Sequence, residues 1–98
     1  MKHFTIRQFM EASGGTWYGP SEALEQDIQG VTIDSRLVQE GFLFIAVPGA
    51  QVDGHRFIPD VYAKGALGAV SQQKLSSPAG PYLLVEDTLQ ALKDGAEA

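Results

Sequence analysis

The chain has 98 residues, 44% of them hydrophobic, a formal net charge of −5 and no cysteine. This length fits one compact domain with a packed core. The negative charge argues against a nucleic-acid partner, because binding to a phosphate backbone depends on clustered Lys and Arg. Without cysteine, the chain has neither a thiolate ligand for a metal nor a thiol nucleophile.

The hydrophobic runs are all shorter than a membrane span, which needs about 20 apolar residues. Residues 1–7 also lack the apolar core of a signal peptide. We therefore expect a cytoplasmic protein with no membrane partner. Four acidic and four basic side chains balance each other within residues 31–75, so the excess negative charge lies toward the two ends. An anionic ligand should prefer the middle of the chain.

The first segment predicts a capped helix. Thr5 and Gln8 have the spacing of a capping box, and Phe4 and Phe9 stand at the positions of a hydrophobic staple. Gly14 suits the left-handed position that ends a helix. A helix that begins after Thr5 and ends at Gly14 is therefore expected.

Short apolar runs predict the strands of a sheet. Residues 42–47 are too few for a buried helix and lie between Gly41 and Pro48, so a strand covered on both faces is expected. Pro59 suits the first turn of a helix that ends at Gly65. The expected strands are residues 16–18, 31–33, 42–47, 66–70 and 82–85, with a polar, acidic stretch at 21–29, loops at 48–54 and 72–81, and a final helix capped by Asp87 or Thr88.

The order of strand, helix and strand over residues 42–70 predicts a βαβ unit, in which the two strands are parallel. We therefore expect an α/β fold with a small, mostly parallel sheet and flanking helices, formed by residues 1–98 as a single domain. Ligands of such sheets usually bind in the crevice beyond the carboxyl ends of the strands.

Sequence motifs of catalysis are missing from the chain. There is no Gly-Lys pair for a phosphate-binding P-loop and no GxGxxG for a dinucleotide. The two histidines, His3 and His55, lack the spacing of metal ligands, and Ser13 lacks the GxSxG context of a hydrolase nucleophile. We expect no catalytic residue, cofactor or metal in this chain.

Two polar motifs follow apolar strands and are the candidate binding residues. The first is TIDSR at residues 32–36, and the second is GAQVDGH at residues 49–55. Both would reach the crevice at the carboxyl edge of the sheet. They also have an ordinary structural interpretation, in which each motif only forms a turn.

In that structural interpretation, Asp34 and Ser35 form a turn closed by their own side chains. Asp53 and Gly54 would form a second tight turn, with Gly54 at positive φ. Arg36 would then be a surface ion-pair partner rather than a ligand contact.

Five segments of the chain are considered together: VTIDSR, EGFLFIAVPG, DGHRFI, KGA and LVEDTLQAL. In this order, and over nearly the whole chain, they resemble the N-terminal domain of the Mur ligases. These enzymes add the third residue or the terminal D-alanyl-D-alanine to UDP-N-acetylmuramoyl peptides. Gly14-Gly15 and Asp87-Thr88 are more similar to the D-alanyl-D-alanine-adding ligase (MurF) than to the third-residue ligase (MurE). Pro48 and Ala50 depart from the residues common in the family.

The resemblance implies that the chain holds the UDP end of a UDP-N-acetylmuramoyl peptide within a larger peptidoglycan-precursor ligase. A central domain with the P-loop, which binds ATP and Mg, and a C-terminal domain would lie outside this chain. Ser35 would hydrogen-bond the uracil or ribose, while Arg36 and His55 would hold the loops or face the diphosphate. Carried over by position, the UDP-binding residues would be Ile33, Asp34, Ser35, Arg36, Gly49, Ala50, Gln51, Val52 and His55.

Two functions of other classes stay open. One is a stand-alone binding or interaction module, and the other is a small enzyme that uses Asp34 and Asp53 as paired carboxylates. Nothing in the sequence brings these two acids together. The coding sequence after residue 98 distinguishes the module from the ligase, since a ligase should continue into a P-loop.

Overall fold

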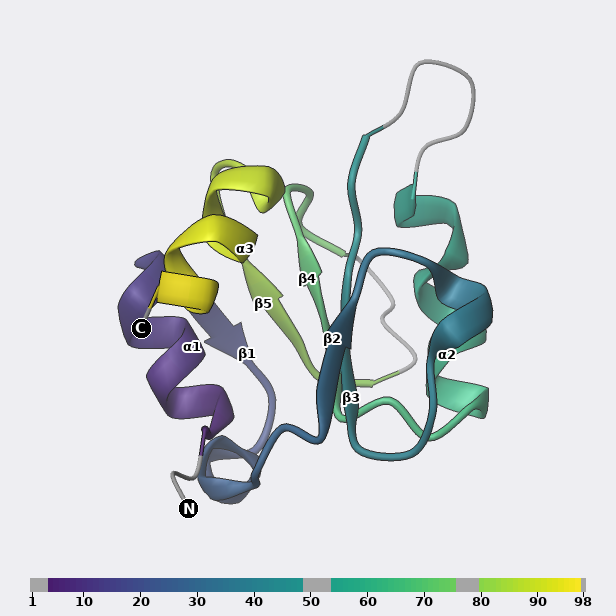
Figure 1. Ribbon diagram of the computed structural model, residues 1–98, viewed down its shortest axis with the longest axis horizontal. Coiled ribbons are helices and arrows are strands. Elements are labelled where there is room, and N and C mark those ends of the chain that lie inside the picture. Colours follow the sequence, from purple (N-terminus) through teal and green to yellow (C-terminus); the bar gives the residue numbers. More distant parts are fainter. Residues whose placement is uncertain (1–3, 49–53, 76–79, 98) are drawn as a thin grey trace.

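The computed structural model describes residues 4–48, 54–75 and 80–97, which form an α/β domain with one five-stranded sheet (Figure 1). The expected fold class is confirmed. In chain order the elements are α1 (Ile6–Ser13), β1 (Thr16–Tyr18), the 3₁₀ helix η1 (Ser21–Glu25), β2 (Gly30–Thr32), η2 (Ser35–Leu37), β3 (Phe42–Ile45), η3 (Gly54–Phe57), α2 (Ile58–Ala63), β4 (Gly68–Ser71), β5 (Tyr82–Leu84) and α3 (Thr88–Glu97).

The sheet has the strand order β1-β5-β4-β3-β2. The four strands from β2 to β5 are parallel, and only β1 is antiparallel to its neighbour β5. The carboxyl ends of the parallel strands therefore lie along one edge of the sheet, at the top in Figure 1. The segments that follow β2 and β3 lie next to each other at this edge, because these two strands are paired.

The capping signals of α1 are confirmed in detail. The Thr5 hydroxyl accepts a hydrogen bond from the Gln8 amide at 3.3 Å, and the Thr5 amide donates to Gln8 Oε1 at 2.8 Å. The rings of Phe4 and Phe9 are 6.1 Å apart between centroids. Gly14 ends the helix in the left-handed conformation with φ of 73°, which costs glycine little because it has no Cβ.

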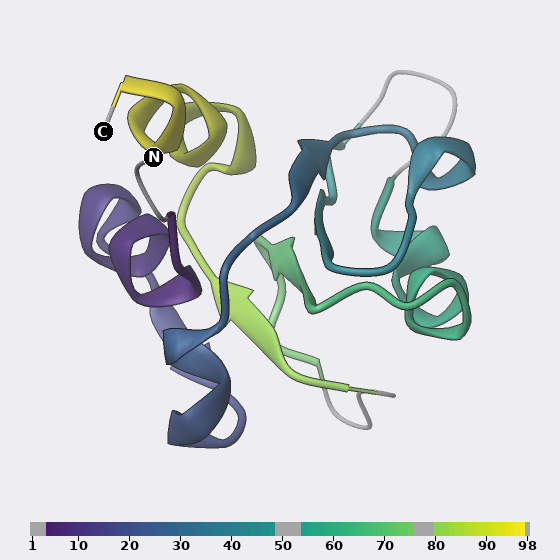
Figure 2. The ribbon, with the colours of Figure 1, turned by 60° about the horizontal axis from the view of Figure 1, so that its bottom comes forward.

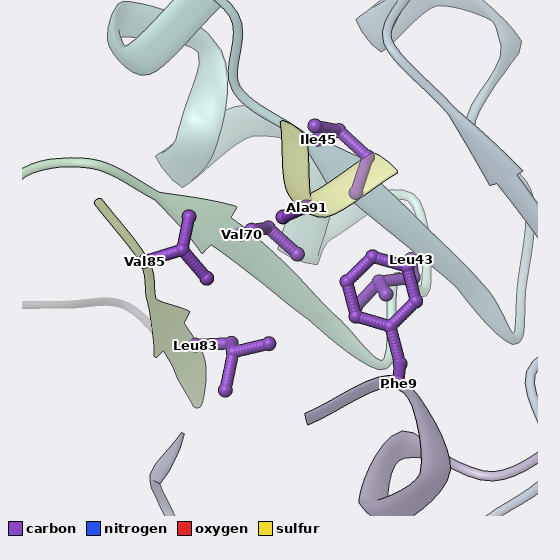
Figure 3. Packing of buried hydrophobic residues seen from close by; sticks show 7 residues of the cluster. All are labelled: Phe9, Leu43, Ile45, Val70, Leu83, Val85 and Ala91. Carbon is purple, nitrogen blue, oxygen red and sulfur yellow. The ribbon is translucent and has the colours of Figure 1, made fainter. Parts of the chain in front are cut away.

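The sheet has a hydrophobic core on each face. Alternate residues of a strand point to opposite faces, so Leu43 packs on the side of α1 and α3, whereas Phe44 packs on the side of α2 (Figure 2). Phe9 of α1 and Ala91 of α3 meet the first face in Figure 3. The β3 run is buried on both faces, as its continuous apolar sequence predicts.

The last helix begins with a side-chain cap, for which the sequence left two candidates. The Asp87 carboxylate accepts hydrogen bonds from the amides of Leu89 and Gln90, at 3.0 and 3.2 Å. Asp87 is therefore the cap. Thr88 is the first helical residue and is fully buried.

Some predicted bounds differ from the structure. The stretch at 21–29, which carried no predicted element, includes η1, whose Leu24 is buried. The strand predicted at 31–33 begins one residue earlier and leaves Ile33 outside it, with 52% of the residue exposed. The strand predicted at 66–70 begins only at Gly68. The ends of short strands depend on pairing with neighbours, which apolar content does not encode.

Candidate functional site

A cavity of about 490 Å³ lies at the carboxyl ends of β2 and β3. This is the edge at which ligands of open α/β sheets usually bind. It joins the segment after β2 to the start of η3, so it brings together parts of both polar motifs. The lining residues are Ile33, Asp34, Ser35, Arg36, Val47, Gly54 and Phe57.

The segment after β2 is a turn that its own side chains stabilise. The Thr32 hydroxyl accepts a hydrogen bond from the Asp34 amide at 3.0 Å. The Asp34 carboxylate accepts from the Arg36 amide at 2.9 Å and caps η2. The structural interpretation is thus correct for Asp34, which forms an Asx-type turn.

Arg36 and Asp34 form an ion pair with two hydrogen bonds. Arg36 Nε lies 3.1 Å from Asp34 Oδ1, and Arg36 Nη2 lies 2.9 Å from Asp34 Oδ2. These bonds lower the pKa of the Asp34 carboxyl to about 2, and they raise the pKa of the Arg36 guanidinium. The Arg36 side chain is still 86% exposed, so one face of a fixed guanidinium is open to solvent beside the cavity.

Ser35 stands in this turn without closing it. Its backbone carbonyl accepts a hydrogen bond from Lys64 Nζ at 2.7 Å. Among the residues that the structure describes, the Ser35 hydroxyl makes no hydrogen bond. The turn therefore uses the side chains of Thr32 and Asp34, and it holds an unused hydroxyl at the cavity.

The other wall of the cavity begins at Gly54. The Gly54 amide donates to the Val47 carbonyl at 2.9 Å, and a Cβ on Gly54 would lie only 2.8 Å from the Val47 nitrogen. Glycine is thus needed at this position because two backbone segments approach closely. The tight turn predicted for Asp53 and Gly54 lies partly outside the described residues. The positive φ predicted for Gly54 is wrong, because the glycines with positive φ in the described part of the chain are Gly14, Gly41 and Gly65.

His55 lies behind this wall and does not line the cavity. Its ring is buried, with 9% of the residue exposed, and its Nε2 accepts a hydrogen bond from the Gln72 amide at 2.9 Å. Of the two roles implied for His55, the contact with Gln72 supports holding the loop. The predicted site residues Gly49, Ala50, Gln51 and Val52 lie outside the described residues, as does Asp53.

Two apolar lining residues were missing from the predicted site. Val47 ends the predicted strand at 42–47, and Phe57 belongs to the DGHRFI segment. The Arg56 guanidinium lies 5.6 Å from the centroid of the Phe57 ring. The positions of Val47 and Phe57, beside the second polar motif, could have indicated that they line the site, because ligand pockets combine apolar walls with a few polar groups.

Within residues 4–48, 54–75 and 80–97, the structure has no group of three or more His, Asp or Glu side chains that could hold a metal ion. This part of the chain also has no helix that is long and apolar enough to cross a membrane.

Comparison with known proteins identifies the family. The family model described as "Mur ligase family, catalytic domain" matches residues 27–98. The chain belongs to the Mur ligase family. This is a family of ATP-dependent peptide ligases, and the fold matches the N-terminal domain of its members.

Curated Mur ligases of one type are similar in sequence. The UDP-N-acetylmuramoyl-L-alanyl-D-glutamate--2,6-diaminopimelate ligase of Aquifex aeolicus is 39% identical over 69 residues, which are 70% of this chain and 14% of that protein. The ligase of the same name from Chlorobium phaeobacteroides is 39% identical over 92 residues, which are 89% of this chain and 17% of that protein. The chain thus spans about a seventh to a sixth of the length of these relatives.

Solved structures of another type are similar in fold. A crystal structure of MurF from Acinetobacter baumannii superposes with a TM-score of 0.82 and 27% identity, over 97% of this chain and 20% of that chain. MurF from Thermotoga maritima in complex with ADP has a TM-score of 0.63 and 30% identity, over 70% of this chain and 16% of that chain. Sequence and structure therefore agree on the Mur ligase family and differ on its member.

Proposed function

We propose that this Mur ligase domain holds the UDP end of a UDP-N-acetylmuramoyl peptide in the cavity between the ends of β2 and β3. The observation that carries this proposal is the Ser35 hydroxyl, which lies at the cavity and makes no hydrogen bond within the described residues. Its turn is already closed by Thr32 and Asp34. A polar group held in place but not used by the fold is suited to bind a ligand.

The chemistry of the cavity fits a nucleotide. A volume of about 490 Å³ is within the usual range for small-molecule sites, roughly 300–1,000 Å³. Ile33, Val47 and Phe57 offer apolar surface for a planar base. The exposed guanidinium of Arg36 offers positive charge for a diphosphate.

The carboxyl-edge cavity also differs in the charge of its lining from a larger cavity at the opposite edge of the sheet. That second cavity, of about 1070 Å³, is lined by Glu25, Asp27 and Glu40 together with Lys64. Three carboxylates there disfavour an anionic ligand. The carboxyl-edge cavity is the better site for UDP, because Arg36 remains exposed beside it.

The proposed role is binding without chemistry. The sequence has no Gly-Lys pair for a P-loop, so ATP and Mg would be held by central and C-terminal parts of the enzyme, outside residues 1–98. Binding of the remote UDP group would place the reacting carboxylate of the peptide at that distant site. Such binding of a non-reacting part of a substrate lowers the barrier by orienting the reacting groups.

For the parent enzyme we propose addition of D-alanyl-D-alanine to UDP-N-acetylmuramoyl-tripeptide. The support is the superposition on MurF over 97% of the chain, which includes α1 and β1. The second candidate is the third-residue ligase, favoured by 39% identity to diaminopimelate ligases. Assay of the complete enzyme with D-alanyl-D-alanine and with diaminopimelate separates the two.

Titration with UDP, followed by amide NMR shifts, tests the binding role. We expect weak, saturable binding, because one domain supplies only part of the full substrate site. The shifts should concentrate in residues 33–36 and in η3. Shifts confined to α1 and α3, or no saturable response, would contradict the proposal and favour an interaction module.

A further inference from the structure

A series of hydrogen bonds runs behind the cavity, from η3 through the end of β4 to the start of α3. The amide of Gln72, directly after β4, donates to His55 Nε2 at 2.9 Å. Gln72 Oε1 accepts from the Thr88 amide at 2.8 Å and from the Thr88 hydroxyl at 3.0 Å. Gln72 therefore contacts both η3 and α3, although it does not line the cavity.

The groups that Gln72 contacts are buried. Thr88 is fully buried, and His55 is 9% exposed. Buried donors and acceptors without partners destabilise a fold, so these bonds constrain both elements. Because Nε2 of His55 accepts a hydrogen bond, the proton of the neutral ring is on Nδ1. The bond thus selects one tautomer and one orientation of the imidazole.

The position of His55 links this series of bonds to the cavity. His55 lies in η3 between Gly54 and Phe57, and both of these line the cavity. Its ring is directed away from the cavity toward the end of β4. A shift of the ring would therefore move the wall of the cavity without any change in a lining side chain.

We propose that Gln72 is a positioning residue for the nucleotide site, which orients His55 through its amide and couples η3 to α3 through its side chain. This inference rests on the proposed function of the cavity. It implies that a change at the start of α3 alters the affinity of the cavity for UDP, although Thr88 does not line it. Hydrogen-bond networks and packed side chains can carry coupling of this kind, and His55, Gln72 and Thr88 form such a network.

Two substitutions at Gln72 form a matched pair. Gln72→Met removes the acceptor for Thr88 at similar volume, whereas Gln72→Glu keeps an oxygen acceptor beside the start of α3, where negative charge is favourable. Gln72→Met loses both hydrogen bonds from Thr88, and we expect it to weaken UDP binding by about fivefold, whereas Gln72→Glu should keep the affinity of the parent protein. The backbone amide that donates to His55 is present in all three proteins, but without the bonds to Thr88 the backbone at residue 72 is free to move away from the ring. The ring nitrogens of His55, measured by ¹⁵N NMR without ligand, should therefore show the Nδ1–H tautomer in the parent and Gln72→Glu proteins and a mixture in Gln72→Met.

A purely structural role for Gln72 would lower the melting temperature of Gln72→Met but leave the Kd for UDP and the His55 tautomer unchanged, which would overturn the inference. If Gln72→Met does not fold, Thr88→Val removes only the hydroxyl donor, and an unchanged His55 spectrum in that variant would equally overturn it. If the parent protein does not bind UDP, the proposed function fails. The His55 spectrum needs no ligand and still decides whether Gln72 positions the ring.

Discussion

At the scale of single residues, neighbouring side chains of the turn after β2 have different roles. Thr32 and Asp34 bond the backbone of the turn, and Lys64 bonds its carbonyl at Ser35. The Ser35 hydroxyl takes part in none of these bonds. From the sequence alone, this motif could form only a turn or could bind a ligand. The structure supports the turn for Asp34, and the Ser35 hydroxyl stays a candidate for ligand binding.

Substitution of Ser35 by Ala separates the two roles. If the hydroxyl bonds the nucleotide, Ser35→Ala should weaken UDP binding by about fivefold, or roughly 1 kcal/mol, with little change in stability. Thr32→Val is the control, because it removes the acceptor of the Asp34 amide and should destabilise the domain on the order of 1 kcal/mol. Urea unfolding and UDP titration of both variants check this. Unchanged affinity of Ser35→Ala would remove Ser35 from the site.

The Asp34 carboxyl should titrate at low pH. Hydrogen bonds from Arg36 lower its pKa in the folded protein to about 2, below the value of about 3.9 for an unfolded chain. Its contribution to stability is therefore complete above about pH 4 and is lost as the pH falls toward 2. In a ¹³C carboxyl titration, Arg36→Gln should raise the midpoint of Asp34. The same midpoint in both proteins would mean that the ion pair is absent in solution.

At the scale of elements, local signals predicted the helices and strands well, and tertiary contacts determined the rest. The capping box at Thr5 and the apolar run of β3 act locally, so the sequence displays them. The 3₁₀ helices are too short for a periodic pattern. The bond between His55 and the Gln72 amide joins residues 17 apart in sequence, and no spacing rule indicates such a contact.

Two glycines at the ends of elements should respond differently to Ala. A Cβ on Gly54 would meet the backbone of Val47 at 2.8 Å, which would displace the wall of the cavity. Gly14 has φ of 73° and open space around it, so Gly14→Ala should cost only about 1 kcal/mol of backbone strain. Both variants should be less stable in urea, but only Gly54→Ala should lose UDP affinity. Equal affinities would show that the η3 wall does not contact the ligand.

At the scale of the whole molecule, the chain belongs to a family of ATP-dependent peptide ligases, and its proposed role is to bind substrate without chemistry. The purified chain should neither bind ATP tightly nor hydrolyse it, because its sequence has no P-loop to hold the triphosphate. A coupled assay for ADP release with Mg and ATP measures this. Activity that survives further purification would show that the chain has a phosphate site of its own.

The most direct test of the central claim is an NMR measurement of the contacts that bound UDP makes with the protein. Intermolecular NOEs from the uracil H5 and H6 protons should reach the side chains of Ile33, Val47 and Phe57, which line the carboxyl-edge cavity. The cavity at the opposite edge, beside Glu40 and Lys64, should give none. NOEs from uracil to that second cavity, with none to Ile33, Val47 or Phe57, would contradict the account.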